Sequence, residues 1–181
     1  EGNKLKTIKD FGDLYAEFIY TGDKLTRINY PIEDTYITIE YNGSGQVIQF
    51  TKFDVGFDYA DRAEVTYSGN TFTRTFYSGD LTSQTELDGT EVVTVTNGNS
   101  TQIVRTFFGP AETNTYTYDS KNAAFKNIDN YDVFRIMELE IPGTTNNVTL
   151  MHFPDFEYTF TYTYNANDYP LTSILKQDNV V

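Results

Sequence analysis

The residue types that most often carry out chemistry are scarce in this sequence. It contains one histidine, His152, and no cysteine. Disulfides and Cys-based metal or redox sites are therefore excluded. A serine nucleophile would need His152 as its base, yet no serine stands in a nucleophile-elbow pattern, and serines such as Ser44 and Ser68 are typical of turns. We predict a structural or surface role for His152, no catalytic residue and no cofactor.

Carboxylates are the other candidates for chemistry, because Asp54, Asp58 and Asp61 lie close together with Gly56 between them. Calcium takes about six to eight oxygen ligands, so this cluster could contribute some of them. The spacing matches no EF-hand, and a solvated acidic loop is the favoured interpretation. We keep the three aspartates as candidate metal ligands. A glycan hydrolase that uses two of the acidic residues is an alternative function, although the required separation cannot be read from a sequence.

Aromatic residues are the most abundant candidates for binding, with 15 tyrosines and 14 phenylalanines but no tryptophan. A tyrosine ring stacks on sugars or apolar ligands, and its hydroxyl forms hydrogen bonds. Most of these rings alternate along the chain as the residues of a core face do. Five tyrosines lie nearer to turns and are the candidates for ligand contacts: Tyr36, Tyr59, Tyr77, Tyr131 and Tyr169.

The elements that carry these residues are repeated hairpins. An apolar run that ends at Tyr20 meets the turn residues Thr21 to Asp23 and is followed by Lys24–Ile28. Asn-Gly, Gly-Asp and Gly-Asn pairs enter the left-handed backbone region at low cost, as short hairpin turns require. The same arrangement recurs at Asn42–Gly45, Ser68–Asn70, Asn97–Asn99, Asp119–Asn122 and Asn165–Asp168.

Alternation of apolar and polar residues with a period of two indicates strands with one buried face and one solvent-exposed face. It is clearest over Tyr158–Tyr164, where aromatic residues and threonines alternate. We also expect a strand at Lys4–Ile8. The alternation stops between Ala123 and Asp132, which indicates a short helix or an irregular turn near Ile128–Tyr131.

These patterns predict an all-β fold: an antiparallel up-and-down meander of about 12–14 short strands, because hairpins join most of them. Such a sheet must close into a barrel or coil strongly into a barrel-like sheet. We expect one domain over residues 1–181, with the repeats at about 4–175. A membrane-spanning barrel is disfavoured, because its strands need about 9–11 residues each and most runs here are shorter.

The charge of the protein excludes some classes of binding partner. Thirteen basic and 26 acidic residues give a net charge of −13, which repels nucleic-acid backbones and anionic lipid surfaces. No stretch approaches the roughly 20 apolar residues of a spanning helix. We therefore expect no nucleic-acid partner and no membrane-crossing helix.

Several segments resemble the tyrosine-aspartate (YD) repeat, notably Tyr116–Asp119, Lys24–Ile28 and Leu171–Ile174. Over most of residues 4–175, and most closely at Tyr118–Ile128 and Tyr164–Ile174, the chain is similar to a family of Bacteroidetes lipoproteins of unknown function with a porin-like fold. The resemblance implies export and a lipid anchor on a cysteine upstream of Glu1. The protein would then face the periplasm or the cell surface from the outer membrane. The resemblance supplies no catalytic residue.

We therefore expect a non-enzymatic protein of the cell envelope that acts as a binding or scaffolding module. Its expected partner is a glycan or another envelope protein. The glycan hydrolase is one alternative, and an assembly component that pairs through exposed strand edges is another. A cavity of several hundred Å³ lined by tyrosine would favour ligand binding over a filled core.

Overall fold

The computed structural model describes residues 3–137 and 143–179. Thirteen strands form one antiparallel sheet in which the spatial order is the order along the chain. The first seven strands are β1 (Thr7–Asp10), β2 (Asp13–Thr21), β3 (Lys24–Tyr30), β4 (Thr35–Tyr41), β5 (Val47–Asp54), β6 (Tyr59–Ser68) and β7 (Thr71–Gly79). The remaining six are β8 (Gln84–Thr96), β9 (Asn99–Thr106), β10 (Glu112–Tyr118), β11 (Val148–His152), β12 (Phe156–Tyr164) and β13 (Pro170–Asn179).

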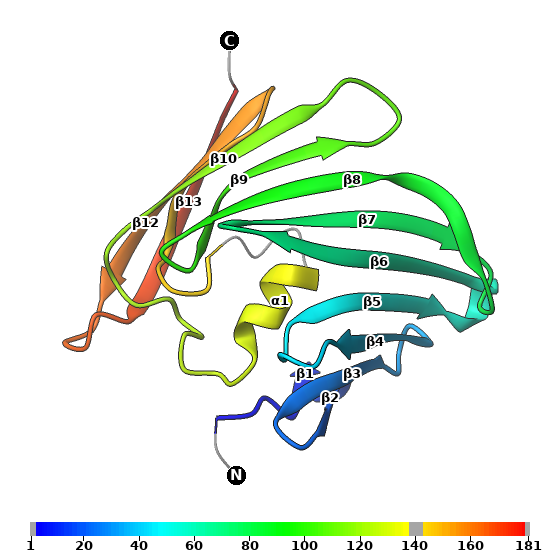
Figure 1. The fold of residues 1–181 in the computed structure, drawn as a ribbon. Coiled ribbons are helices and arrows are strands. Elements are labelled where there is room, and N and C mark those ends of the chain that lie inside the picture. The colour runs from blue at the N-terminus through cyan, green and yellow to red at the C-terminus, as the bar shows by residue number, and fades with distance from the viewer. Residues whose placement is uncertain (1–2, 138–142, 180–181) are drawn as a thin grey trace.

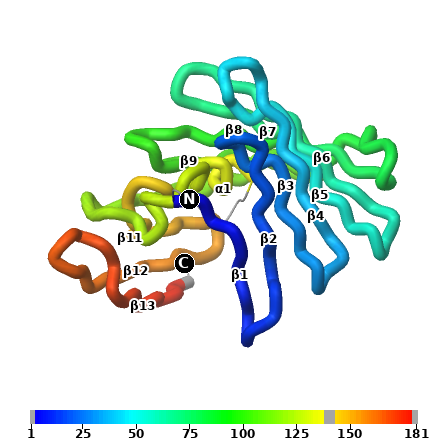
Figure 2. The backbone as a smooth tube through the Cα atoms, turned by 90° about the horizontal axis from the view of Figure 1, so that it is seen from below, coloured from blue at the N-terminus to red at the C-terminus, as the bar shows by residue number. Residues whose placement is uncertain are grey.

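The predicted meander is confirmed, and the sheet is coiled but open. Each strand pairs with the next, and β1 and β13 are the two outer strands of the order. The sheet curls so that its concave face surrounds one helix, α1 (Tyr131–Met137) (Figures 1 and 2). A 3-10 turn (Val55–Phe57) connects β5 and β6. Of the two expected forms, the coiled barrel-like sheet is the one observed among the described strands.

Most of the predicted tight turns are present. β8 and β9 are joined by Asn97 and Gly98 alone, whose φ angles are 52° and 80°. Gly22, between β2 and β3, has a φ of 60°. These positive angles are why glycine and asparagine occupy such hairpin turns. The expected strand at Lys4–Ile8 begins later, because β1 starts at Thr7.

One expected hairpin is wrong. After β10 the chain leaves the sheet at Asp119, forms α1 inside the curl, and returns to the sheet in β11 (Figure 1). Helical spacing of Val133, Ile136 and Met137 explains the departure, because all three side chains are buried in the core of the sheet. The helix begins at Tyr131, the last residue of the Ile128–Tyr131 stretch where the loss of alternation predicts a short helix or an irregular turn.

The core lies on the concave face, where every second residue of a strand points inward. In β4, for example, Ile37 and Ile39 are buried and pair with Ile28 and Phe50 of the neighbouring strands. Burial of an aliphatic or aromatic side chain contributes about 1.5–3 kcal/mol, so this face supplies most of the driving force for folding. The most deeply buried apolar side chains are Ala16, Leu25, Ile28, Val47, Ala60, Ala63, Val93 and Ile103.

Four tyrosine hydroxyls each bond to the strand that precedes their own strand in the sheet. Tyr41, at the end of β4, donates to the carbonyl oxygen of Leu25 near the start of β3, at 2.6 Å. Tyr67 in β6 likewise donates to Val47 O in β5, at 2.9 Å. The same bond recurs from Tyr118 to Ser100 O and from Tyr162 to Val148 O. The recurrence of tyrosine before the turns therefore has a structural cause, because each hydroxyl satisfies a carbonyl of the adjacent strand.

A buried ion cluster attaches the helix to the sheet. Glu91 of β8 forms an ion pair with Arg74 of β7 at 2.5 Å and accepts a hydrogen bond from Arg105 Nε of β9 at 2.7 Å. Arg74 Nη1 also donates to the carbonyl oxygen of Ile136, at 3.0 Å. Carbonyls in the last turn of a helix carry partial negative charge, so the arginine stabilises the end of α1. Burial lowers the pKa of the Arg74 guanidinium, an effect that Glu91 opposes.

Candidate ligand-binding site

A cavity of about 810 Å³ lies on the concave face between the sheet and α1. The strands that line it come from the first two thirds of the chain, and α1 forms its opposite wall (Figure 1). Its lining is mostly apolar, with charged side chains along part of it. The apolar lining residues are Ile8, Tyr15, Ala16, Phe18, Tyr30, Ile37, Phe50, Ala63, Phe76, Phe107, Phe134 and Met137.

The floor of the cavity arises from large and small residues that alternate across neighbouring strands. Phe50 of β5 pairs with Ala63 of β6, Ala63 pairs with Phe76 of β7, and Phe76 pairs with Gly89 of β8. These positions point to the same face, because paired residues of antiparallel strands do so. The two small residues leave space between the phenylalanine rings, and that space is part of the cavity.

Two aromatic contacts close the sides of the cavity. Phe134 of α1 packs edge-on against Phe18 of β2, with ring centroids 5.6 Å apart. Phe107, which follows β9, lies against Phe76 at 5.5 Å. A Cβ added to Gly89 would lie 2.9 Å from the Phe107 Cα, so only glycine at this position lets Phe107 approach. The wall formed by Phe107 therefore depends on the absence of a side chain at Gly89.

Charged residues lie in one cross-strand row at the cavity. Lys52 of β5 pairs with Asp61 of β6, and Asp61 pairs with Ser78 of β7. The Ser78 hydroxyl donates to Asp88 Oδ1 at 3.0 Å. Within the described part of the chain, no ion pair engages the Lys52 ammonium, although Asp61 is its cross-strand neighbour. The row therefore offers one free cation beside two carboxylates.

Arg62 also contributes to the lining, but its guanidinium is already occupied. It lies over the ring of Tyr77 at 4.3 Å, bonds to Glu64, and donates to the carbonyl oxygen of Gln84 at 3.0 Å. A cation held by a ring, a carboxylate and a carbonyl gains little from a further partner. Lys52 is therefore the better donor for a ligand.

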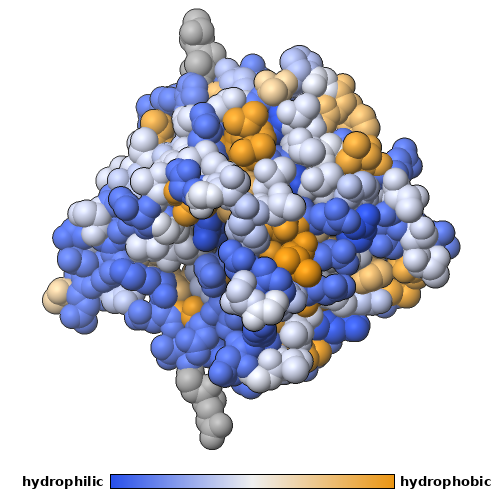
Figure 3. Space-filling model, in the orientation of Figure 1, coloured by the Kyte–Doolittle hydropathy of each residue, from blue (hydrophilic) through white to orange (hydrophobic). Residues whose placement is uncertain are grey.

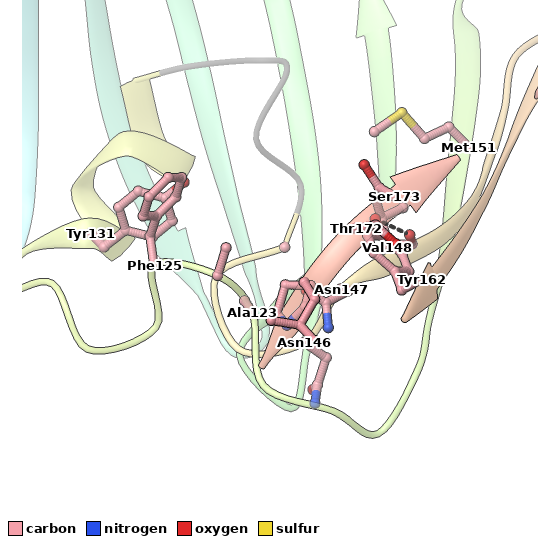
Figure 4. A pocket seen from close by; sticks show the side chains of 14 residues that line it. Ala123, Phe125, Tyr131, Asn146, Asn147, Val148, Met151, Tyr162, Thr172 and Ser173 are labelled. Atoms are coloured by element: carbon pink, nitrogen blue, oxygen red, sulfur yellow. Dashed lines mark hydrogen bonds between the residues drawn. The ribbon is translucent and has the colours of Figure 1, made fainter. Parts of the chain in front are cut away.

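A second pocket of about 380 Å³ lies between the loop after β10 and the strands β11 to β13 (Figure 4). Its apolar lining includes Phe125, Tyr131, Val148, Met151 and Tyr162. Figure 4 shows Phe125 and Tyr131 on the helix side, and Met151, Tyr162 and Ser173 on the strand side. This pocket is smaller than the cavity at α1 and is open to one side of the sheet.

The polar groups of the second pocket are satisfied within the protein. Asn147 donates its backbone N–H and its side-chain Nδ2 to the carboxylate of Asp119, both at 3.1 Å. Tyr164 donates to the same carboxylate; burial raises the pKa of this tyrosine, and the hydrogen bond to Asp119 raises it further. Asn146 donates to Lys121 O at 2.8 Å. These groups hold the loop onto the sheet, so we assign them a structural role.

The five tyrosines predicted for ligand contacts are not brought together. Tyr36 stacks on Phe53 at 4.7 Å beneath Arg27, and Tyr77 lies beneath Arg62. Tyr59 donates to Asp61 Oδ1 at 2.6 Å, and Tyr169 accepts from Asn127 at 2.5 Å. Tyr131 lines the second pocket. None of the five lines the cavity at α1, whose tyrosines are Tyr15 and Tyr30.

The candidate metal ligands are also separate. Asp54 ends β5, Asp58 has a left-handed backbone after the 3-10 turn, and Asp61 lies within β6. The described residues contain no group of three or more His, Asp or Glu side chains that could hold a metal ion. Asp61 alone of the three lines the cavity. A glycan hydrolase that uses Asp54 and Asp58 stays a prediction.

His152 lies at the end of β11, as its neighbours indicated. Its Nδ1 is 3.4 Å from Glu157 Oε2 on β12, and its side chain is 42% exposed. An exposed pair of this kind contributes little to stability. The arrangement fits the surface role that the sequence indicated.

The cavity residues that sequence reasoning missed are the phenylalanines. Alternation assigns Phe18, Phe50 and Phe76 to the inner face, and it does not distinguish a filled core from the wall of a cavity. A usable signal was present in Ala63 and Gly89, which are small residues at inner positions. These small residues indicate a cavity only once the strand register shows that they lie between the phenylalanine rings.

The molecular face in Figure 3 is largely hydrophilic, and its apolar residues form separate patches. Among the described residues, no helix has the length and apolar character needed to cross a membrane.

No model of a known protein family matches this chain, and no curated protein matches it. Among solved structures it is similar to the crystal structure of a porin-like protein from Bacteroides uniformis. The two chains are 12% identical, and the match covers 84% of this chain and 88% of the other with a TM-score of 0.31. A similarity this distant does not support an argument about function.

Proposed function

We propose that this protein is a non-enzymatic binding module that holds a small amphiphile in the cavity at α1. The observation that carries the proposal is the cavity itself, which has a volume of about 810 Å³ and a mostly apolar lining. Ligand sites in proteins typically measure about 300–1,000 Å³ and combine apolar walls with a few polar groups. A sheet that needed only a filled core would carry a larger side chain than Ala63 between the rings of Phe50 and Phe76.

The lining indicates the chemistry of the ligand. An aliphatic or ring-containing body would lie against Phe18, Phe50 and Phe76, where it loses contact with water. Its polar head would lie between the Lys52 ammonium and the carboxylates of Asp61 and Asp88. Groups of both signs favour a neutral or zwitterionic head. A purely anionic head is disfavoured, because the net charge of −13 repels it during approach.

The proposal also includes the cellular location of the protein. We propose that the protein is exported and held at the cell envelope by a lipid anchor upstream of Glu1. The support for this part is the resemblance of Tyr118–Ile128 and Tyr164–Ile174 to exported lipoproteins. A sugar as the neutral head group would agree with the glycan partner that the sequence suggested.

The test is a binding measurement with four dodecyl amphiphiles below their micelle concentrations: a phosphocholine, a maltoside, a carboxylate and an ammonium. We expect calorimetric binding and a raised melting temperature with the phosphocholine and the maltoside, and weaker effects with the two charged compounds. No binding by any of the four would overturn the proposal.

Two matched variants locate the site. Ala63→Leu places extra carbon atoms between Phe50 and Phe76 and should weaken binding at least tenfold. Ala124→Leu makes the same change at the second pocket, where Ala124 is exposed, and should leave binding unchanged. The reverse pattern would place the ligand at the second pocket. Because Ala63 is buried, the melting temperature of the ligand-free variant shows whether Ala63→Leu is folded.

A third variant tests the polar head. Lys52→Gln removes the free cation from the exposed end of the cavity and leaves the apolar walls intact. We expect it to weaken phosphocholine binding, because the phosphate loses its partner, and to change maltoside binding less. Equal losses for both compounds would contradict the assignment of Lys52 to the head group.

A further inference from the structure

The last strand of the sheet, β13, has a free edge. It pairs with β12 on one side, and no described strand lies on its other side. Every residue from Leu171 to Gln177 is exposed. The N–H and C=O groups on that side are therefore available for pairing with another chain.

The composition of β13 is unusual for a free edge. Leu171, Ile174 and Leu175 are 66%, 69% and 57% exposed. Proteins usually protect an edge with a short strand, with charges or with proline. β13 is ten residues long, its proline stands at its first position, and Lys176 is the single charge between Pro170 and Gln177. The other edge, β1, has only four residues, and Lys9 and Asp10 are two of them.

The charge of this edge suits a second copy of the same chain. The protein as a whole carries −13, so two copies repel each other over most of their surfaces. At β13 the Lys176 ammonium forms an ion pair with Asp178 at 2.8 Å. Beside the start of the strand, Lys121 and Asp168 form another ion pair, at 2.7 Å. The edge is thus locally neutral, and an identical edge can approach it without net repulsion.

The register of β13 places its side chains on known faces. Ile174 pairs with Thr161 on the outer face, whereas Ser173 and Leu175 pair with Tyr162 and Phe160 on the concave face. Ser173 lines the second pocket, which opens beside this strand (Figure 4). An added strand would therefore place every second side chain on the concave face, and the one opposite Ser173 would lie beside that pocket.

We propose that two copies of this protein associate through antiparallel pairing of their β13 strands about a twofold axis at Ile174. Ile174 then lies opposite Ile174 of the second copy, and the most exposed aliphatic side chain of each strand is covered. Leu175 of the second copy lies opposite Ser173, at the mouth of the 380 Å³ pocket, and the symmetry repeats this contact. Thr172 faces Lys176 of the second copy, so no like charges meet in the ladder.

A twofold arrangement also limits the assembly to a dimer. Pairing of β13 with β1 of another copy would leave free edges at both ends and would continue into a polymer. Pairing of two β13 strands uses both long edges and leaves only the two short, charged β1 edges.

The test uses the absence of cysteine from the chain. Ile174→Cys places two thiols opposite each other across the axis, where Cα atoms of antiparallel partners lie about 4.5–5.5 Å apart, within the range of a disulfide. Thr161→Cys is the matched control, because Thr161 is exposed on the same face one strand further in. We expect mild oxidation to convert most of the first variant, and almost none of the second, into a linked dimer on a non-reducing gel.

Sedimentation velocity of the unmodified protein completes the test. We expect a dimer that dissociates on dilution, and a shift toward monomer in Ile174→Lys, which places two ammonium groups opposite each other. Monomer alone at high concentration, species larger than a dimer, or equal cross-linking of the two cysteine variants would overturn the proposal.

Discussion

The Arg74 guanidinium and the Glu91 carboxylate lie 2.5 Å apart, and their side chains are 1% and 0% exposed. An ion pair at this depth is a poor source of net stability, because both charges have lost their water. The main effect of this ion pair is to fix the position of α1. Arg74 also reaches the Ile136 carbonyl, so the pair fixes the end of α1 above the cavity.

The first prediction concerns removal of one member of this pair. Glu91→Gln leaves the Arg74 guanidinium buried without a counter-charge, and we expect it to lower the free energy of unfolding by about 3–5 kcal/mol. Urea denaturation measures the change. Glu64→Gln is the control, because Glu64 pairs with Arg62 at a partly exposed site and should cost at most about 1 kcal/mol. Equal losses in the two variants would show that Arg74 does not depend on Glu91.

The second prediction concerns the tyrosine bonds between hairpins. Tyr41→Phe deprives the Leu25 carbonyl of its donor, and an unsatisfied buried acceptor costs about 1–3 kcal/mol. Tyr59→Phe is the control, because Tyr59 is exposed and its partner Asp61 is exposed as well. We expect its effect on unfolding to be within about 0.5 kcal/mol. An equal loss in both variants would count against a role for the Tyr41 bond.

The same tyrosines set the response to alkaline pH. Burial raises the pKa of Tyr41 from 10.0 to about 12, so the folded state holds this proton more tightly than the unfolded state does. The contribution to stability is complete below pH 10 and is lost as the pH rises toward 12. We expect the free energy of unfolding to fall over that interval, and to fall less steeply in Tyr41→Phe. Phenolate absorbance during the titration reports the ionisation, and a single transition at pH 10 for all tyrosines would contradict the expectation.

Sequence reasoning recovers the strands because their signals are local. Asn97 and Gly98 specify a two-residue turn by themselves, and Tyr158–Tyr164 shows its two faces by alternation. Closure of the sheet into a barrel, by contrast, is not determined by local sequence. It depends on whether β1 and β13 meet, and α1 occupies the interior that a closed sheet would have to surround (Figure 2).

The candidate site is harder to predict for a related reason. Inner positions such as Phe50 and Phe76 are recognisable in the sequence, but the residue between them in space, Ala63, lies on another strand. Cross-strand neighbours depend on register, which turns and bulges set one strand at a time. Tyr36 and Tyr77 lie near turns in the sequence, and this position alone makes them candidates for ligand contacts. Each is covered by an arginine, a contact that no spacing in the sequence shows.

The fourth prediction concerns the close approach of Phe107 to β8. Gly89→Ala adds a Cβ that would clash with the Thr106 carbonyl oxygen and lie 2.7 Å from Phe107 Cδ1 and 2.9 Å from its Cα, so Thr106 and Phe107 must both move. Overpacking of this kind costs about 1–3 kcal/mol, and the displaced ring would also weaken amphiphile binding. Gly109→Ala is the control, because a Cβ there meets nothing within 4 Å. Thermal unfolding and calorimetry measure both effects, and an unaffected Gly89→Ala would show that the Phe107 wall adapts.

The fifth prediction concerns Asn99, the first residue of β9, which is 3% exposed. Its Oδ1 accepts from the backbone N–H groups of Thr145 and Asn146, both at 3.1 Å, and its Nδ2 donates to Asn146 Oδ1 at 2.9 Å. Asn99→Ala removes all three bonds, and each donor left unsatisfied in a buried site costs about 1–3 kcal/mol.

Those bonds hold the segment that leads into β11. Asn99→Ala should therefore lower the local stability of this segment as well as the global stability of the fold. We expect the backbone amides of Thr145 and Asn146 to exchange hydrogen much faster in Asn99→Ala. The exchange rates of amides in β4 and β5 should change only as much as the global free energy of unfolding changes. Asn127→Ala removes one exposed bond, to Tyr169, and should leave the Thr145 and Asn146 amides protected. Uniform acceleration across the whole sheet in Asn99→Ala would mean that the segment does not open separately from the rest of the fold.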